Sequence, residues 1–171
     1  NKISVLALGG THLIAMLDTA GTIVAGRVLS SSGELSPLIT GGNWAGLPIV
    51  AEVLASGRVQ AATEIIPSEF LAQVGLDTEA FIPLKETPLA APEPFHPQEG
   101  SAGLALTGVH PVHDASGLIG AAVSVYLFNN DFTLVDRIKA VAGIDTVTIF
   151  FGDLRVATNV MTENSERAVG T

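Results

Sequence analysis

Two histidines and a carboxylate stand close together in the segment His110-Pro-Val-His113-Asp114, and such residues can bind a metal ion or form a His–Asp dyad. On an extended strand, however, residues three positions apart point to opposite faces of the sheet. Both imidazoles would therefore meet one ion only if the backbone turned between them. We interpret the segment as the end of a β-hairpin with solvated histidines, and we expect no bound metal.

The remaining sequence has no recognisable catalytic motif: GxSxG, HExxH and Walker-type loops are all absent. The pair Gly9-Gly10 precedes a predicted strand, whereas a phosphate-binding loop follows a strand and opens a helix. The lack of cysteine excludes disulfides, thiolate metal sites and cysteine nucleophiles. Four charged residues are interpreted as solvated groups of hairpin turns: Asp153, Arg155, Glu163 and Arg167. We therefore expect no enzyme activity in this chain and no cofactor.

Several other side chains are better suited to binding than to catalysis. A small-molecule pocket needs an apolar lining and a few convergent polar groups. The candidates for such a ligand-binding site are Arg27, Trp44, Lys85, His110, Ser124 and Tyr126. The alternative interpretation is purely structural, with Trp44 fixing a loop, Tyr126 in the core with a bonded hydroxyl and Lys85 in solvent.

The composition restricts the class of protein. The chain has 171 residues, is 47% hydrophobic and 15% charged, and carries 8 basic against 17 acidic residues, a net charge of −9. This is too apolar for disorder and too acidic for nucleic acid or an anionic membrane surface. The longest apolar run, residues 118–128, is shorter than the roughly 20 residues that span a bilayer. Since the chain does not begin with methionine, we expect a fragment or a processed chain.

Apolar spacing and turn residues predict the order of elements along the chain. A hairpin with a turn at Asp18-Thr-Ala-Gly21 is followed by a loop over 30–46, and Gly57 ends the first helix. The expected elements are strands 12–18 and 22–29, a helix over 47–54, strand 59–66, a short helix 68–74 with Ser68 as N-cap, strands 104–112 and 118–128, a helix 132–141 capped by Asn130 or Asp131, and strands 146–151 and 154–159.

One segment, residues 75–103, shows no expected element and contains five prolines: Pro83, Pro88, Pro92, Pro94 and Pro97. Loops of this length inside a domain are commonly lids or binding loops. The whole pattern predicts an α+β fold, in which a five-stranded antiparallel sheet is flanked by helices and the Pro-rich loop lies over a pocket.

Several segments also occur in an order that resembles a known family. They are Ser68-Glu-Phe-Leu-Ala-Gln-Val-Gly-Leu76, Pro111-Val-His-Asp-Ala-Ser-Gly-Leu-Ile-Gly120, Leu134-Val-Asp-Arg-Ile138, Thr148-Ile-Phe-Phe-Gly-Asp-Leu-Arg-Val-Ala-Thr-Asn-Val160 and Arg167-Ala-Val-Gly-Thr171. The series resembles the extracytoplasmic Cache (PAS-like) sensor region of bacterial transmembrane receptors, of the Cache3–Cache2 type. The most specific part is residues 148–160 with the Arg-Ala-Val-Gly-Thr that follows.

The resemblance implies a PAS-like sheet and a periplasmic region of an inner-membrane receptor, such as a histidine kinase or a chemotaxis receptor. It implies a sensor module over 1–130, a linking helix over 131–144, and the first hairpin of a second, truncated module over 145–171. It further implies a small ligand such as an organic acid or amino acid, a homodimer in the full receptor, and membrane attachment through helices absent from this chain. No ligand motif can be matched residue by residue.

Two other hypotheses stay open. The chain could be a structural or dimerisation module without a ligand of its own, because exposed apolar faces form dimers. It could also be a small hydrolase or metal-dependent enzyme built on His110, His113 and Asp114. We rank the sensor first, the structural module second and the enzyme third.

Overall fold

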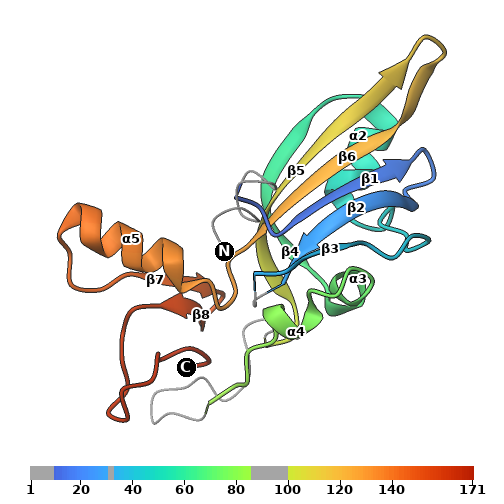
Figure 1. Cartoon of the computed structure of the whole chain (residues 1–171). Helices are drawn as coiled ribbons and strands as arrows, with labels where there is room; N and C mark the ends of the chain where they lie inside the picture. The colour runs from blue at the N-terminus through green and yellow to red at the C-terminus, as the bar shows by residue number, and fades with distance from the viewer. Residues whose placement is uncertain (1–9, 31–32, 86–99) are drawn as a thin grey trace.

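Alternating buried and partly exposed residues build an antiparallel six-stranded sheet (Figure 1). The computed structural model describes residues 10–30, 33–85 and 100–171. The strands are β1 (Leu13–Asp18), β2 (Ile23–Leu29), β3 (Leu35–Pro37), β4 (Gln60–Ile66), β5 (Gly103–Asp114) and β6 (Gly117–Leu127), and their spatial order is β3-β2-β1-β6-β5-β4. The predicted α+β class with an antiparallel sheet is confirmed.

The sheet has six strands rather than the five expected from the sequence. The additional strand, β3, lies in the segment 30–46 that was interpreted as a loop, and it pairs with β2 at the sheet edge. Its three residues are too few to show a period of two. Its last residue, Pro37, is tolerated because an edge strand does not need every backbone N–H.

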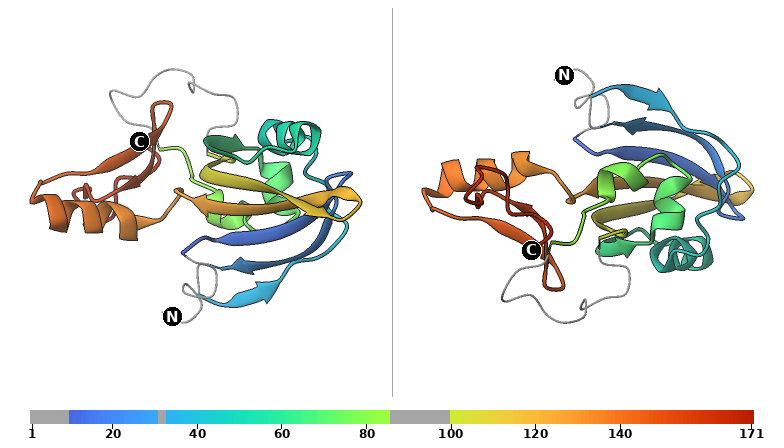
Figure 2. Two further views of the ribbon diagram at one scale, coloured as in Figure 1. Left: turned by 90° about the horizontal axis from the view of Figure 1, so that it is seen from above. Right: turned by 90° about the horizontal axis from the view of Figure 1, so that it is seen from below.

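Three helices cover one face of the sheet (Figure 2): α2 (Pro48–Ser56), α3 (Ser68–Ala72) and α4 (Asp77–Ala80). Helix α2 has proline in its first turn and ends at Gly57, whose φ of 64° permits the left-handed cap predicted there. Its Val50 and Val53 are fully buried against the sheet. We call the covered face the inner face and the opposite one the outer face.

Two local expectations differ from the structure. Pro67, not Ser68, occupies the N-cap of α3, and no side chain caps this helix. Helix α4 lies inside the segment 75–103, for which no element was expected, because four residues cannot show a helical period. Pro88, Pro92, Pro94 and Pro97 lie outside the described residues, and so does the central part, 86–99, of the predicted loop over a pocket.

The chain then leaves the sheet and forms α5 (Phe132–Ala142), β7 (Thr148–Phe151) and β8 (Leu154–Thr158). Of the two predicted caps, Asn130 and Asp131, the structure has Asp131, which accepts a hydrogen bond of 2.9 Å from the Thr133 N–H. Strands β7 and β8 pair as a hairpin, which lies with α5 beyond one end of the large sheet (Figure 2). None of the described helices is long and apolar enough to cross a membrane.

A second apolar cluster joins this C-terminal unit to the rest of the protein. It consists of Ile82, Ala102, Phe151, Leu154 and Val156, all buried. The first two belong to segments beside α4 and β5, and the other three belong to the β7–β8 hairpin. The hairpin therefore packs directly onto the part of the chain that carries the large sheet.

Candidate functional site

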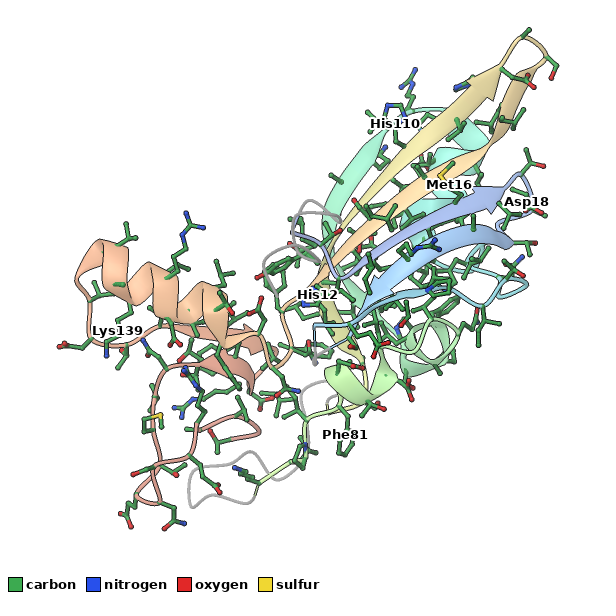
Figure 3. All side chains as sticks on the ribbon, viewed as in Figure 1. His12, Met16, Asp18, Phe81, His110 and Lys139 are labelled. Atoms are coloured by element: carbon green, nitrogen blue, oxygen red, sulfur yellow. The ribbon has the colours of Figure 1, made fainter. Side chains whose placement is uncertain are left out.

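Four of the six side chains proposed from the sequence lie on the outer face of the sheet. The inner face is marked by buried Val123 and Val125, so Ser124 and Tyr126 between and after them face the other way. Arg27 shares a row of the sheet with Ser124, because both pair with Ile14. His110 pairs with Ala122, two residues before Ser124, and is therefore on the same face (Figure 3).

The polar atoms of three of these residues contact neighbouring backbone. Arg27 donates to the Gly26 carbonyl at 3.0 Å, and Ser124 donates to the Gly108 carbonyl at 3.5 Å. One ring nitrogen of His110 lies 2.8 Å from the Pro111 carbonyl. These contacts are local, so the outer face presents a row of separate polar groups rather than a group converging on one point.

The other two predicted residues lie elsewhere. Trp44 is fully buried, and its indole N–H has no hydrogen-bond partner within the described ranges. Lys85 lies beside the C-terminal segment, where its ammonium is 3.9 Å from the Glu166 carboxylate and its backbone N–H bonds to the Gly170 carbonyl. The structure thus does not bring the six predicted residues together around one cavity.

His110 and His113 lie on opposite sides of the sheet, as the strand geometry predicts. A β-carbon built at Gly57, at the end of the inner-face helix α2, would come within 3.8 Å of His113 Nε2. Asp114 is bound to Ser116, accepting from its backbone N–H and its hydroxyl. In the part of the chain that the structure describes, no three His, Asp or Glu side chains are grouped to hold a metal ion.

Tyr126 connects the end of β6 to the start of α5. Its hydroxyl donates a hydrogen bond to the carboxylate of Asp131, and its ring makes edge contacts with His12 and Phe128 at centroid distances of 5.1 and 5.3 Å. The pKa of Tyr126 is raised above its usual range, mainly because the hydroxyl is partly buried and secondly because it donates to Asp131. The hydroxyl therefore stays protonated and donates a hydrogen bond from β6 to Asp131, the residue that caps α5.

His12 lies immediately before β1 (Figure 3), and its ring packs against the ring of Tyr126. Its Nδ1 accepts a hydrogen bond of 3.0 Å from the Leu127 N–H, which requires an unprotonated nitrogen. Burial lowers the pKa of His12, while the nearby carboxylates of Asp131 and Glu79 oppose this effect. The hydrogen bond to the Leu127 N–H therefore requires the imidazole of His12 to be neutral in the folded protein.

The turn between β6 and α5 holds several elements at once. The buried Asn129 amide donates to the carbonyls of Ala80 and Ala102 and accepts from the Leu104 N–H. The Asn130 side chain donates to the carbonyls of Glu79 and Phe81, while its backbone N–H bonds to Val156 of β8. The side chains of Asn129 and Asn130 therefore bind α4 and the start of β5, and the Asn130 backbone links this turn to the C-terminal hairpin.

A cavity of about 350 Å³ opens between α5 and the segment that follows β8. Its size falls in the range of small-molecule sites. The lining residues are Asp136, Lys139, Ala140, Asn159, Met161 and Arg167. None of them belongs to the site proposed from the sequence.

Arg167 is fixed at the wall of this cavity. Its guanidinium donates to both carboxylate oxygens of Asp136 at 2.9 and 2.7 Å and to the Thr158 carbonyl at 2.9 Å, and it lies 4.5 Å from the Phe132 ring centre. The hydrogen bonds from Arg167 lower the pKa of Asp136. The interpretation of Arg167 as a solvated turn residue is therefore wrong, because its partner lies 31 residues earlier in the chain.

Three of the cavity residues that were not predicted from the sequence lie in segments that the family resemblance had singled out. Asp136, Asn159 and Arg167 all lie in the short segments on which the family resemblance rests. Their spacing alone gives no reason to group them, since the pair and the cavity depend on the packing of α5 against β8.

Comparison with known proteins finds a family match in this C-terminal region. Residues 126–171 match the family described as single Cache domain 3, and every residue lining the cavity falls within that range. The match confirms the Cache-type sensor resemblance over these residues, including the segments 148–160 and 167–171. No curated protein matches the chain.

Two solved structures are similar in shape. One is the domain of a sensory box/GGDEF family protein from Vibrio parahaemolyticus, with 14% identity and a TM-score of 0.48 over 78% of this chain and 43% of that one. The other is the extracellular domain of a protein described as the histidine kinase vpHK1S-Z8, with 13% identity and a TM-score of 0.47 over 86% of this chain and 46% of that one. The chain therefore spans less than half the length of either structure.

Proposed function

We propose that the chain is the extracytoplasmic, ligand-binding sensor region of a bacterial signal-transduction receptor, either a histidine kinase or a chemoreceptor. The observation that carries this proposal is the match of α5, β7 and β8 to a Cache family, on a segment that also lines an open cavity of about 350 Å³. The bound metabolite is a small organic molecule, and the chain itself is not an enzyme. The receptor is a homodimer in the inner membrane, attached through helices outside this chain.

Signal transmission in this proposal uses the contacts between the two units. A ligand that binds one of two conformations more tightly shifts their populations by that difference in affinity. Helix displacements of about 1–2 Å are sufficient to pass such a shift between elements. The Tyr126–Asp131 hydrogen bond and the Asn130 contacts support this route, because they join the large sheet, α4 and β8.

The division into modules is part of the same proposal. Residues 1–130 form the first sensor module, residues 131–144 the linking helix, and residues 145–171 the first hairpin of a second module. The direct packing of Phe151, Leu154 and Val156 onto Ile82 and Ala102 supports a mechanical connection between the two modules.

A structural or dimerisation module is the second candidate. Apolar side chains are exposed on the outer face of the sheet and on α5: Leu106 is 48% exposed, Ile65 39% and Val141 81%. Such faces can pair with a second copy of the chain. A monomer in sedimentation experiments at concentrations up to about 1 mM would remove this candidate.

The first experiment is a thermal-shift screen of the 171-residue chain against organic acids, amino acids and sugars. A compound at about 100 times its Kd stabilises the folded state by about 2.7 kcal/mol, which raises Tm by several degrees for a chain of this size. A saturable shift supports the sensor function. A screen without any shift, together with a dimer in solution, supports the structural module instead.

A further inference from the structure

The His12 side chain takes the place of a strand neighbour at the end of the large sheet. Its Nδ1 accepts the N–H of Leu127, the last residue of β6, at 3.0 Å. The backbone on either side of this ring is fixed, because the His12 N–H bonds to the Val125 carbonyl at 2.8 Å and its carbonyl accepts the Leu29 N–H at 2.7 Å. Only an unprotonated Nδ1 can accept the Leu127 N–H, so this closure of the sheet depends on one titratable group.

The charged and titratable groups that face His12 come from several other elements. Tyr126 of β6 presents its ring at a centroid distance of 5.1 Å. Asp131 at the start of α5 and Glu79 of α4 favour a protonated imidazole through their negative charge, and burial of the ring opposes them. Arg27 of β2 lies on the same face of the sheet, and its guanidinium bonds to the backbone of its own strand. A proton on His12 would therefore meet two carboxylates.

The nearer partner in this network, Asp131, already serves two donors. One of its carboxylate oxygens accepts the Tyr126 hydroxyl, and the other accepts the Thr133 N–H at 2.9 Å, which is the N-cap bond of α5. The Tyr126 ring is also in edge contact with His12. A continuous series of contacts thus leads from the imidazole to the first turn of α5.

We propose that His12 is an acid-sensing site, at which one proton from the solvent detaches the end of β6 from the segment before β1 and alters the cap of α5. Protonation places a hydrogen on Nδ1, so that Nδ1 and the Leu127 N–H become two donors that face each other, and their hydrogen bond is lost. The imidazolium is attracted to Asp131 and competes there with the Tyr126 hydroxyl and the Thr133 N–H. This inference goes beyond the proposed ligand-binding function, because its input is a proton and no metabolite takes part.

The pH range of this change follows from the surroundings of His12. Burial lowers its pKa from the ordinary value of about 6.5, although Asp131 and Glu79 reduce this effect. The neutral ring and its bond to Leu127 are therefore intact above about pH 6.5, and the protonated arrangement forms as the pH falls below that value.

The test is an NMR titration of the complete 171-residue chain from pH 7.5 to 5. The signals followed are the His12 ring and the backbone amides of Leu127 and Thr133. We expect all three to change with one common midpoint below about pH 6.5, because one proton controls both hydrogen bonds. A Leu127 amide with a midpoint different from that of the His12 ring, or a Thr133 amide that does not change, would overturn the proposal.

A pair of histidine variants assigns the effect to one residue. His12→Gln keeps a side chain that can accept a hydrogen bond but removes the titrating ring, so the pH-dependent shifts of Leu127 and Thr133 should disappear. His110→Gln is the matched control, since it removes an exposed imidazole from the same face of the sheet, and it should leave both shifts as in the wild type. Shifts that persist in His12→Gln would show that another group is responsible.

A second pair of variants tests the role of Asp131 without changing the histidine. Tyr126→Phe keeps the ring against His12 but leaves the Asp131 carboxylate without its hydroxyl donor, so the imidazolium has less competition and the His12 midpoint should move to higher pH. Ser124→Ala removes a hydroxyl from the same strand and face and should leave the midpoint unchanged. Equal midpoints in the two variants would mean that Asp131 is not the partner of the protonated ring, and the proposed switch would be wrong.

Discussion

Asp136 and Arg167 meet through two parallel hydrogen bonds of 2.9 and 2.7 Å, which connect the middle of α5 to the chain beyond β8. The same guanidinium also bonds to the Thr158 carbonyl and lies over the Phe132 ring. One side chain thus holds α5 at two positions and the end of β8 at a third. The wall of the candidate cavity depends on this arrangement.

Replacing Arg167 by Gln should therefore loosen α5 from β8. We expect a lower Tm than in the wild type. We also expect the amide hydrogen exchange rates to increase more in α5 than in the large sheet. Arg137→Gln is the matched control, because it removes an exposed charge from the same helix. If both variants have the same Tm and exchange rates, the paired hydrogen bonds do not hold the helix in solution.

The Tyr126 hydroxyl is predicted to stabilise the connection between β6 and α5. Tyr126→Phe keeps the ring contacts with His12 but removes the donor to Asp131, so the free energy of unfolding should fall by about 1 kcal/mol. Urea denaturation measures this change. Ser124→Ala removes a hydroxyl with only a long contact from the same strand and face, and should cost less. The reverse order of the two effects would contradict the role of Tyr126.

The lowered pKa of His12 predicts an acid-sensitive fold. The unfolded chain binds a proton at His12 near its ordinary pKa of about 6.5, while the folded chain resists protonation to lower pH. The stabilisation from the neutral imidazole is therefore complete above about pH 6.5 and is lost as the pH falls through the folded pKa. Tm measured from pH 7.5 to 5 should fall less steeply for His12→Gln than for the wild type. A direct NMR titration showing a folded pKa above 6.5 would reject this explanation.

Gly170 is predicted to be essential for the close approach of the C-terminal segment to residues 83–85. Its φ is 82°, and a β-carbon there would lie 2.2 Å from the Pro83 carbonyl oxygen. Gly170→Ala should destabilise the fold through both backbone strain and this clash, by roughly 2 kcal/mol or more. Gly143→Ala is the control: its φ is 66° but it has open space, so it should show the strain alone, about 1 kcal/mol. Equal losses in urea denaturation would mean that Pro83 does not approach Gly170.

The elements predicted from the sequence are those whose signal is local. The hairpins follow from turn residues such as Asp18 to Gly21, and the end of α2 follows from Gly57. Strand β3 and helix α4 were missed because three or four residues do not show a period.

The candidate site was harder to predict than the fold, for a physical reason. Trp44 and Lys85 were chosen as binding groups from their residue types, but the fold places one in the core and the other beside Glu166. The buried Nδ2 of Asn159, which has no hydrogen-bond partner among the described residues, could not be found from the sequence, because it is left over only after Val147 takes the oxygen of the same amide. The most specific segments of the family resemblance contribute Asn159 and Arg167 to the lining of the cavity, and the other four lining residues lie outside them.

The turn at Asn129 and Asn130 has a mechanical consequence. Asn130 adopts a φ of 56°, and its side chain and backbone bond to α4 and β8 respectively, while Asn129 is bonded on both ends of its amide. A turn fastened in this way cannot act as a flexible joint. We therefore expect a displacement of α4 to move α5 with it, so that a change in the large sheet reaches the far end of α5 as a tilt of the helix rather than as local unfolding.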